Sequence, residues 1–112
     1  MTQMTSSLDT WATLLHTTAT QKGFWDYEQV TPEVVLSKLA LVASEVSEVL
    51  EAYRKQHGSE AIVEEFADII IRTLDLYDGM REVGLVTHSL DEVFRNKAEK
   101  NLAREHKHGN LL

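Results

Sequence analysis

Proline and glycine are scarce in this sequence, and their scarcity leaves long stretches in which a helix can run without interruption. One proline and five glycines occur in 112 residues. Between them, apolar residues recur at intervals of three and four positions, which is the period of an amphipathic helix. The alternating pattern of a half-buried strand is hard to find. The sequence therefore predicts an all-α fold of four helices, joined by short turns in a bundle-like arrangement.

Capping signals divide the chain into four predicted helices. Thr31 followed by Pro32 is typical of an N-cap and a first helical position. Ser59 is the next candidate cap, and Ser89 begins a Ser-Leu-Asp-Glu capping box. Glycines provide the expected stops. The predicted helices span about 7–21, 32–56, 59 to a stop at Gly79 or Gly84, and 89–106.

The size and composition of the chain fit one domain, residues 1–112, with a modest hydrophobic core. There is no cysteine, which excludes disulfide frameworks and thiolate chemistry and favours a reducing compartment. The first residues lack the pattern of a signal peptide, and no run of 18 apolar residues occurs. We therefore expect a cytoplasmic protein that does not span a membrane.

Charge is distributed unevenly along the chain. The net charge is −7, yet residues 95–108 contain five basic and only two acidic side chains. The body of the protein is therefore strongly acidic, whereas a general duplex-binding protein needs a broad basic surface. We expect no nucleic-acid partner. A small anionic ligand that brings its own cations remains compatible with this charge.

Two pairs of carboxylates, each three positions apart, lie on consecutive predicted helices. Glu45 and Glu48 border the apolar face of the second helix, and Glu65 and Asp68 share a face of the third, just before the isoleucines at 69–71. Antiparallel packing of the two helices would bring all four acids together. A carboxylate without a partner in apolar surroundings would cost several kcal/mol, so a cation is expected beside them.

Clustered oxygen ligands without His or Cys suit Mg²⁺, with Mn²⁺ as a substitute, better than zinc or copper. Magnesium usually combines a few carboxylates with water and substrate phosphates, so the acids indicate a metal-dependent phosphate site. The alternative is that they are solvated acids in surface ion pairs, as in most helical Glu-x-x-Glu patterns. Arg72 is the nearest predicted countercharge.

Further motifs flank the two carboxylate pairs in a fixed order. Lys22-Gly-Phe-Trp-Asp26 precedes Glu45-Val-Ser-Glu48 and Glu65-Phe-Ala-Asp68, and Lys97, Asn101, Arg104 and His108-Gly109 follow. This order resembles that of the MazG-like all-α nucleoside triphosphate pyrophosphohydrolases, which use Mg²⁺ to cleave a nucleoside triphosphate between its α and β phosphates. The resemblance covers most of the chain.

The resemblance implies that Glu45, Glu48, Glu65 and Asp68 are the metal ligands. Many members of the family carry a further glutamate where this chain has Ser44, which leaves the number of metal ions open. Magnesium can polarise a phosphate and neutralise the leaving pyrophosphate without a protein nucleophile. A carboxylate not fully committed to metal could accept the proton of the attacking water, and we assign that role to Glu48.

Substrate contacts can be assigned to three regions. Lys97 and Asn101 occupy motif positions of the family and share a helical face, while Lys38 lies two turns before Glu45 on the same side. The aromatic connection after the first helix offers a stacking surface for a base. A purine deoxynucleotide such as dGTP is the favoured substrate. The phosphate-binding candidates are Lys38, Arg72, Lys97, Asn101 and Arg104, and the base-binding candidates are His16 and Trp25.

Other functions remain open at the level of sequence. Phosphoribosyl-ATP pyrophosphohydrolase shares the superfamily and the chemistry, although the Lys-Gly-Phe-Trp stretch points away from it. A di-iron carboxylate bundle is disfavoured because no glutamate has a histidine three residues later. A non-catalytic helical interaction module is the third alternative. The apolar second and third helices predict a homo-oligomer. The resemblance implies a dimer or a tetramer built as a dimer of dimers, with active sites near subunit contacts.

Overall fold

The computed structural model describes residues 7–26 and 30–104, and these residues form four helices with no strand among them. The all-α prediction is confirmed. The expected helix end near His106 and the closing motif residue His108 lie outside the described residues. No described helix combines the length and apolarity needed to cross a membrane. The helices are α1 (Leu8–Gln21), α2 (Pro32–Arg54), α3 (Ser59–Glu82) and α4 (Leu90–Ala103).

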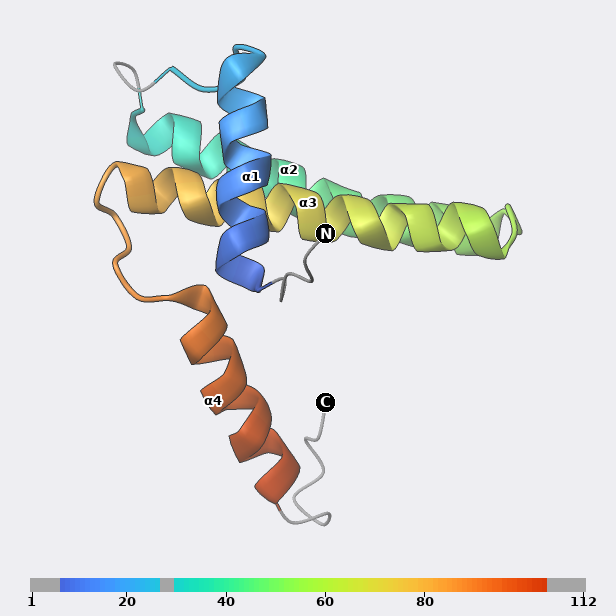
Figure 1. Ribbon diagram of the computed structural model, residues 1–112. Coiled ribbons are helices and arrows are strands. Elements are labelled where there is room, and N and C mark those ends of the chain that lie inside the picture. The colour runs from blue at the N-terminus through green and yellow to red at the C-terminus, as the bar shows by residue number, and fades with distance from the viewer. Residues whose placement is uncertain (1–6, 27–29, 105–112) are drawn as a thin grey trace, which may run out of the picture.

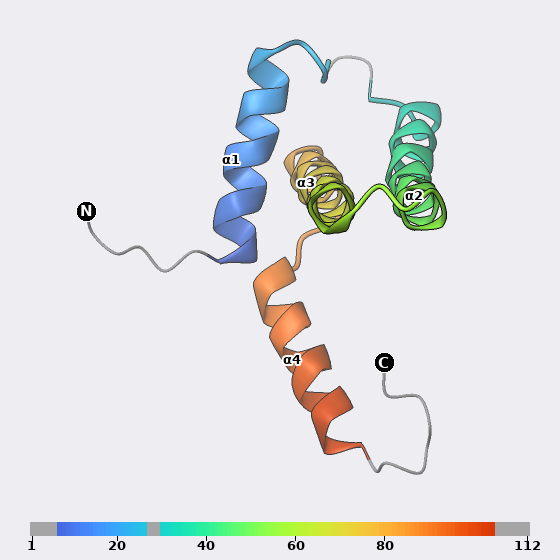
Figure 2. The same cartoon turned by 90° about the vertical axis from the view of Figure 1, so that its right-hand side faces the viewer.

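Helix α3 is the centre of the fold. It runs antiparallel to α2 in a long hairpin, and α1 crosses it steeply on its other side, so that α3 lies between α1 and α2 (Figures 1 and 2). Helix α4 packs chiefly against α1 and extends away from the hairpin (Figure 1). Helices α1, α2 and α3 thus pack together. In the predicted bundle-like arrangement α4 would lie along the other three, and in this structure it does not.

Local side-chain caps set several of the helix boundaries as predicted. The hydroxyl of Thr31 accepts from the Val34 amide, and that of Ser89 accepts from the Glu92 amide. Ser59 is not a cap, contrary to the prediction. The N-cap position belongs to Gly58, whose φ of +100° completes the tight reversal between α2 and α3.

The interior is small and centres on the crossing of α1 and α3. Ala12, Leu74 and Leu76 are buried there with Trp25, and Ala52 is buried further along the hairpin. Helix α3 continues past Gly79 because that glycine lies directly beneath the Trp25 ring and serves close packing rather than termination. Gly84, with a φ of +82°, follows the end of the helix.

The N-termini of α1 and α4 meet and cap each other. The Asp9 carboxylate accepts hydrogen bonds from the Ser89 hydroxyl (2.6 Å) and the Asp91 amide (3.2 Å). The Asp91 carboxylate in turn accepts from the Leu8 amide (3.2 Å). Two acids therefore neutralise the positive ends of both helix dipoles. This junction fixes where α4 begins, while its remaining turns extend into solvent.

Candidate functional site

Three carboxylates converge where α2 and α3 run side by side. Glu45 of α2 and Glu65 and Asp68 of α3 each offer an oxygen, and these oxygens lie within 4.8 Å of one another. Antiparallel packing brings the two motifs into register, as expected. Glu48 lies one turn further along α2, is exposed, and is outside this converging group. We call Glu45, Glu65 and Asp68 the acidic cluster.

The surroundings of the acidic cluster shift the pKa of one of its members. The pKa of Glu65 is raised above its ordinary value, first by loss of solvation and then by the negative charges of Asp68, Glu48 and Glu45. Glu48 therefore acts on the cluster electrostatically even though its oxygens lie outside it. A bound cation would relieve this repulsion.

Arg72 is the cation that reaches the acidic cluster. Its Nε donates to the Glu45 Oε2 at 2.6 Å, and the Glu45 side chain is only 13% exposed. The predicted countercharge is therefore present, although it pairs with Glu45 and not with Asp68. One guanidinium against three converging acids and the adjacent Glu48 leaves this region negatively charged.

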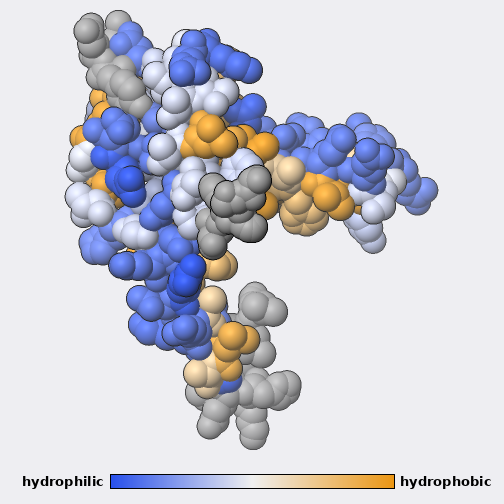
Figure 3. All heavy atoms as spheres, in the orientation of Figure 1, coloured by the Kyte–Doolittle hydropathy of each residue, from blue (hydrophilic) through white to orange (hydrophobic). Residues whose placement is uncertain are grey.

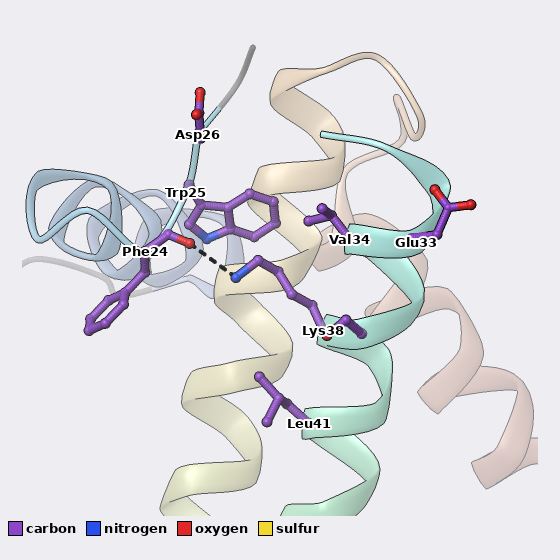
Figure 4. A pocket seen from close by; sticks show the side chains of 8 residues that line it. Phe24, Trp25, Asp26, Glu33, Val34, Lys38 and Leu41 are labelled. Atoms are coloured by element: carbon purple, nitrogen blue, oxygen red, sulfur yellow. Dashed lines mark hydrogen bonds between the residues drawn. The ribbon is translucent and has the colours of Figure 1, made fainter. Parts of the chain in front are cut away.

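A pocket lies beside the hairpin, next to the aromatic connection that follows α1. Its volume is about 380 Å³, within the range of small-molecule sites. The Lys38 ammonium lies 4.3 Å from the centroid of the Trp25 ring and donates to the Phe24 carbonyl at 3.2 Å (Figure 4). The pocket is lined by Phe24, Trp25, Asp26, Glu33, Val34, Ser37, Lys38 and Leu41.

The two predicted base-binding residues lie together but are buried. His16 is 3% exposed and Trp25 is 6% exposed, and their rings meet edge to face with centroids 4.8 Å apart. Of the two, only Trp25 lines the pocket, and Lys38 covers one face of its ring. His16 lies behind the indole, where α1 crosses α3.

Asp75 contacts both His16 and Trp25, and the sequence analysis did not identify it as a site residue. Its Oδ1 accepts from Trp25 Nε1 at 3.0 Å and lies 2.7 Å from His16 Nδ1. Asp75 follows Asp68 by seven residues and so shares its face of α3. The seven-residue spacing can be read from the sequence. The partners of Asp75, however, lie on another helix and in a loop, and no local sequence pattern connects them to Asp75.

The pocket and the acidic cluster are linked along the α2–α3 interface. A cavity of about 20 Å³ is lined by Lys38, Leu41, Arg72, Asp75 and Leu76. Lys38 also lines the larger pocket, and Arg72 also binds Glu45. Two cations therefore lie between a ring-walled pocket and a group of acids. The pocket, the two cations and the acidic cluster thus follow one another along the hairpin.

The predicted phosphate-binding residues of the C-terminal region are not brought to this site within one chain. Lys97 and Asn101 lie on α4, and Arg104 is its C-cap. Since α4 extends away from the hairpin (Figure 2), these side chains are remote from the acidic cluster.

Comparisons of the chain with models of known families, with characterised proteins and with solved structures found no significant match. The likeness to the MazG-like enzymes therefore rests on the residues and their order.

Proposed function

We propose that this protein is a Mg²⁺-dependent nucleoside triphosphate pyrophosphohydrolase of the MazG-like type, acting in the cytoplasm. The observation that carries the proposal is the convergence of the acidic cluster, Glu45, Glu65 and Asp68. Lys38 and Arg72 lie between this cluster and the pocket that Trp25 lines. The product would be a nucleoside monophosphate together with pyrophosphate.

The acidic cluster fits a divalent cation on its donor set alone. Its donors are carboxylate oxygens on two rigid helices, and the pKa of Glu65 is raised by loss of solvation and then by neighbouring negative charge, which a cation would neutralise. Glu45, Glu65 and Asp68 would hold Mg²⁺, with Glu48 as the fourth ligand implied by the resemblance. Magnesium bound there would stabilise charge on the transferred phosphoryl group and on the leaving pyrophosphate.

The remaining residues bind the triphosphate and accept a proton. Arg72 and Lys38 would hold phosphate oxygens through charge-assisted hydrogen bonds. Water attacks the α-phosphorus, the bond from that phosphorus to the oxygen bridging the α and β phosphates breaks, and the water proton passes to the Glu48 carboxylate. The exposure of Glu48 supports this role, because a base must be able to release the proton afterwards.

The base would enter the pocket beside Trp25, with a purine deoxynucleotide such as dGTP as the favoured substrate. In this structure Lys38 occupies the face of the indole where a base would stack. Binding would therefore move the ammonium from the ring toward the phosphates. Aromatic surfaces provide such stacking at little entropic cost.

The proposal includes a homo-oligomer, a dimer or a dimer of dimers. The hairpin beyond α1 is covered by no other described helix, and one side of α4 also carries apolar side chains (Figure 3). A second chain would cover these surfaces, and its α4 could carry Lys97, Asn101 and Arg104 to the acidic cluster. The exposed apolar residues are Val46, Leu50 and Tyr53 of α2, Val63, Phe66 and Ile70 of α3, and Val93, Phe94 and Leu102 of α4.

Light scattering coupled to gel filtration should give a mass of two or four chains. Phe66→Glu should shift this mass toward that of one chain, because a charge in an apolar interface must be desolvated on association. Thr17→Glu, at an exposed polar position of α1, is the matched control and should keep the wild-type mass. A wild-type protein that is monomeric at about 50 µM would refute an oligomer with a dissociation constant in the micromolar range or below.

Thermal unfolding tests metal binding independently of turnover. Mg²⁺ should raise the melting temperature of the wild type, because ligand binding to the folded state stabilises it. Glu65→Gln should raise the melting temperature of the metal-free protein by relieving repulsion, and it should reduce the increase produced by Mg²⁺. An equal Mg²⁺ increment in both proteins would exclude Glu65 as a ligand.

The proposed function is tested by incubating the protein with each common dNTP and NTP and Mg²⁺, and with phosphoribosyl-ATP. Pyrophosphate and orthophosphate release are measured separately. Pyrophosphate from one or more nucleoside triphosphates supports the proposal, and turnover of phosphoribosyl-ATP alone would assign the related enzyme. No turnover together with no stabilisation by Mg²⁺ would favour a non-catalytic module, in which the Arg72–Glu45 pair is simply structural.

A further inference from the structure

We infer that Asp75 is a positioning residue for nucleobase recognition: it fixes His16 and Trp25 in one orientation and so sets the shape of the ring-walled pocket. The inference rests on the proposed function, because it concerns the base section of the same site. It adds a residue that belongs to neither the acidic cluster nor the wall of the pocket.

A single oxygen of Asp75 ties together two rings from separate parts of the chain. Trp25 Nε1 donates to it at 3.0 Å, and His16 Nδ1 lies 2.7 Å from it. His16 belongs to α1, Trp25 to the connection after α1, and Asp75 to α3. The His16 contact is as short as a charge-assisted hydrogen bond, and the Trp25 contact has the ordinary length of an N–H···O bond.

The chemistry of these groups limits where the shared protons can lie. An ionised carboxylate can only accept, and an indole N–H can only donate. Asp75 therefore selects a form of His16 that carries a proton on Nδ1. The resulting hydrogen bond prevents the imidazole ring from flipping. The same carboxylate orients the N–H edge of the indole inward.

Packing prevents the indole from adopting another position. Trp25 lies against Gly79 of α3 so closely that a Cβ there would stand 2.5 Å from its Cη2. The Lys38 ammonium covers one face of the indole from the pocket side. With its N–H edge bonded to Asp75 and its Cη2 and Cζ2 atoms against Gly79, the indole is fixed in the orientation that it presents to the pocket.

Asp75 also joins the two halves of the proposed site. It lines the small cavity between Lys38 and Arg72, the two cations assigned to the phosphates, and its side chain is 22% exposed. Its location between base, phosphate and metal sections indicates a role in ligand geometry.

The test compares three variants. Asp75→Ala removes the acceptor, and Asp75→Asn retains an acceptor oxygen without the charge. Asp78→Asn is the matched control, since Asp78 is a more deeply buried aspartate of the same helix, with Arg81 as its ion-pair partner at 3.9 Å. The measurements are the indole N–H resonances in a ¹⁵N spectrum and kcat and KM for four dNTPs with Mg²⁺.

In Asp75→Ala the Trp25 N–H signal should move and exchange faster with water, while that of Trp11 on α1 serves as an internal reference. The ratio of kcat/KM between the best and the worst base should fall by about tenfold, mainly through KM, as expected for loss of an orienting hydrogen bond. Asp75→Asn should recover most of this ratio. Asp78→Asn should lower stability and change neither measurement.

Two results would overturn the inference while leaving the proposed function intact. One is a shifted Trp25 signal in Asp75→Ala with an unchanged ratio between bases, and the other is a wild-type enzyme that does not discriminate between bases. Wild-type protein that hydrolyses no dNTP would instead overturn the proposed function and this inference with it. If Asp75→Ala does not fold, Trp25→Phe removes the donor of the same hydrogen bond. An unchanged ratio of kcat/KM between bases in Trp25→Phe would also overturn the inference.

Discussion

Asp68→Asn should reduce nucleoside triphosphate hydrolysis by about a thousandfold or more, because the amide cannot neutralise a divalent cation as a carboxylate does. The replacement keeps the shape of the side chain. Asp68 is exposed, so the folded structure should lose no more than about 0.5 kcal/mol. The loss of rate, measured by pyrophosphate release under saturating Mg²⁺, should therefore appear in a protein whose far-UV spectrum is normal and whose melting temperature without metal is no lower than that of the wild type.

Glu48→Gln should lose activity to a similar extent for a different reason. Glu48 lies outside the converging oxygens, so it would hold the cation less closely than the acidic cluster does, and it is also assigned to accept the water proton. The variant should therefore retain much of the Mg²⁺-induced thermal stabilisation, whereas Asp68→Asn should lose it. Comparing the two variants separates metal binding from proton transfer.

The control for both variants is Glu51→Gln. Glu51 lies on α2 within one turn of Glu48, its side chain is 44% exposed, and it pairs with Arg54 and Lys55. Surface pairs of this kind contribute little, so activity should stay near that of the wild type. Unaltered hydrolysis in Asp68→Asn or in Glu48→Gln would refute the role assigned to that residue.

The parts of the site that the sequence predicts correctly are those that depend on helix geometry alone. Glu65 and Asp68 share a face because of their spacing, and a short turn between two long helices requires Glu45 to approach them. The caps at Thr31 and Ser89 are equally local, since each hydroxyl bonds an amide three residues later. Features that depend on only one or two helical turns can therefore be predicted from the sequence.

The features that sequence reasoning missed depend on contacts between distant segments. Asp75 has partners 50 and 59 residues away, and nothing in its neighbourhood indicates them. The steep crossing of α1 over α3 buries both His16 and Trp25, and it leaves Trp25 in the wall of the pocket while His16 lies behind it. The direction of α4 is set by the contacts among Asp9, Ser89 and Asp91, which periodicity does not encode.

Gly79→Ala should destabilise the fold, although helix propensity alone predicts the opposite sign. Alanine in place of glycine inside a helix ordinarily stabilises by about 1 kcal/mol. At this position the new Cβ would lie 2.5 and 2.6 Å from the Cη2 and Cζ2 atoms of Trp25, and 3.0 Å from Cε1 of His16. Overpacking of this kind typically costs about 1–3 kcal/mol.

The ring cannot relieve the clash cheaply, because moving the indole away from α3 stretches its hydrogen bond to Asp75. Urea unfolding at fixed protein concentration should therefore show a lower midpoint for Gly79→Ala than for the wild type. Thr73→Ala, at an exposed position of the same helix, is the control and should leave the midpoint equal or slightly higher. A midpoint for Gly79→Ala above that of the wild type would mean that Trp25 does not rest on α3, and the pocket described beside it would then have a different wall.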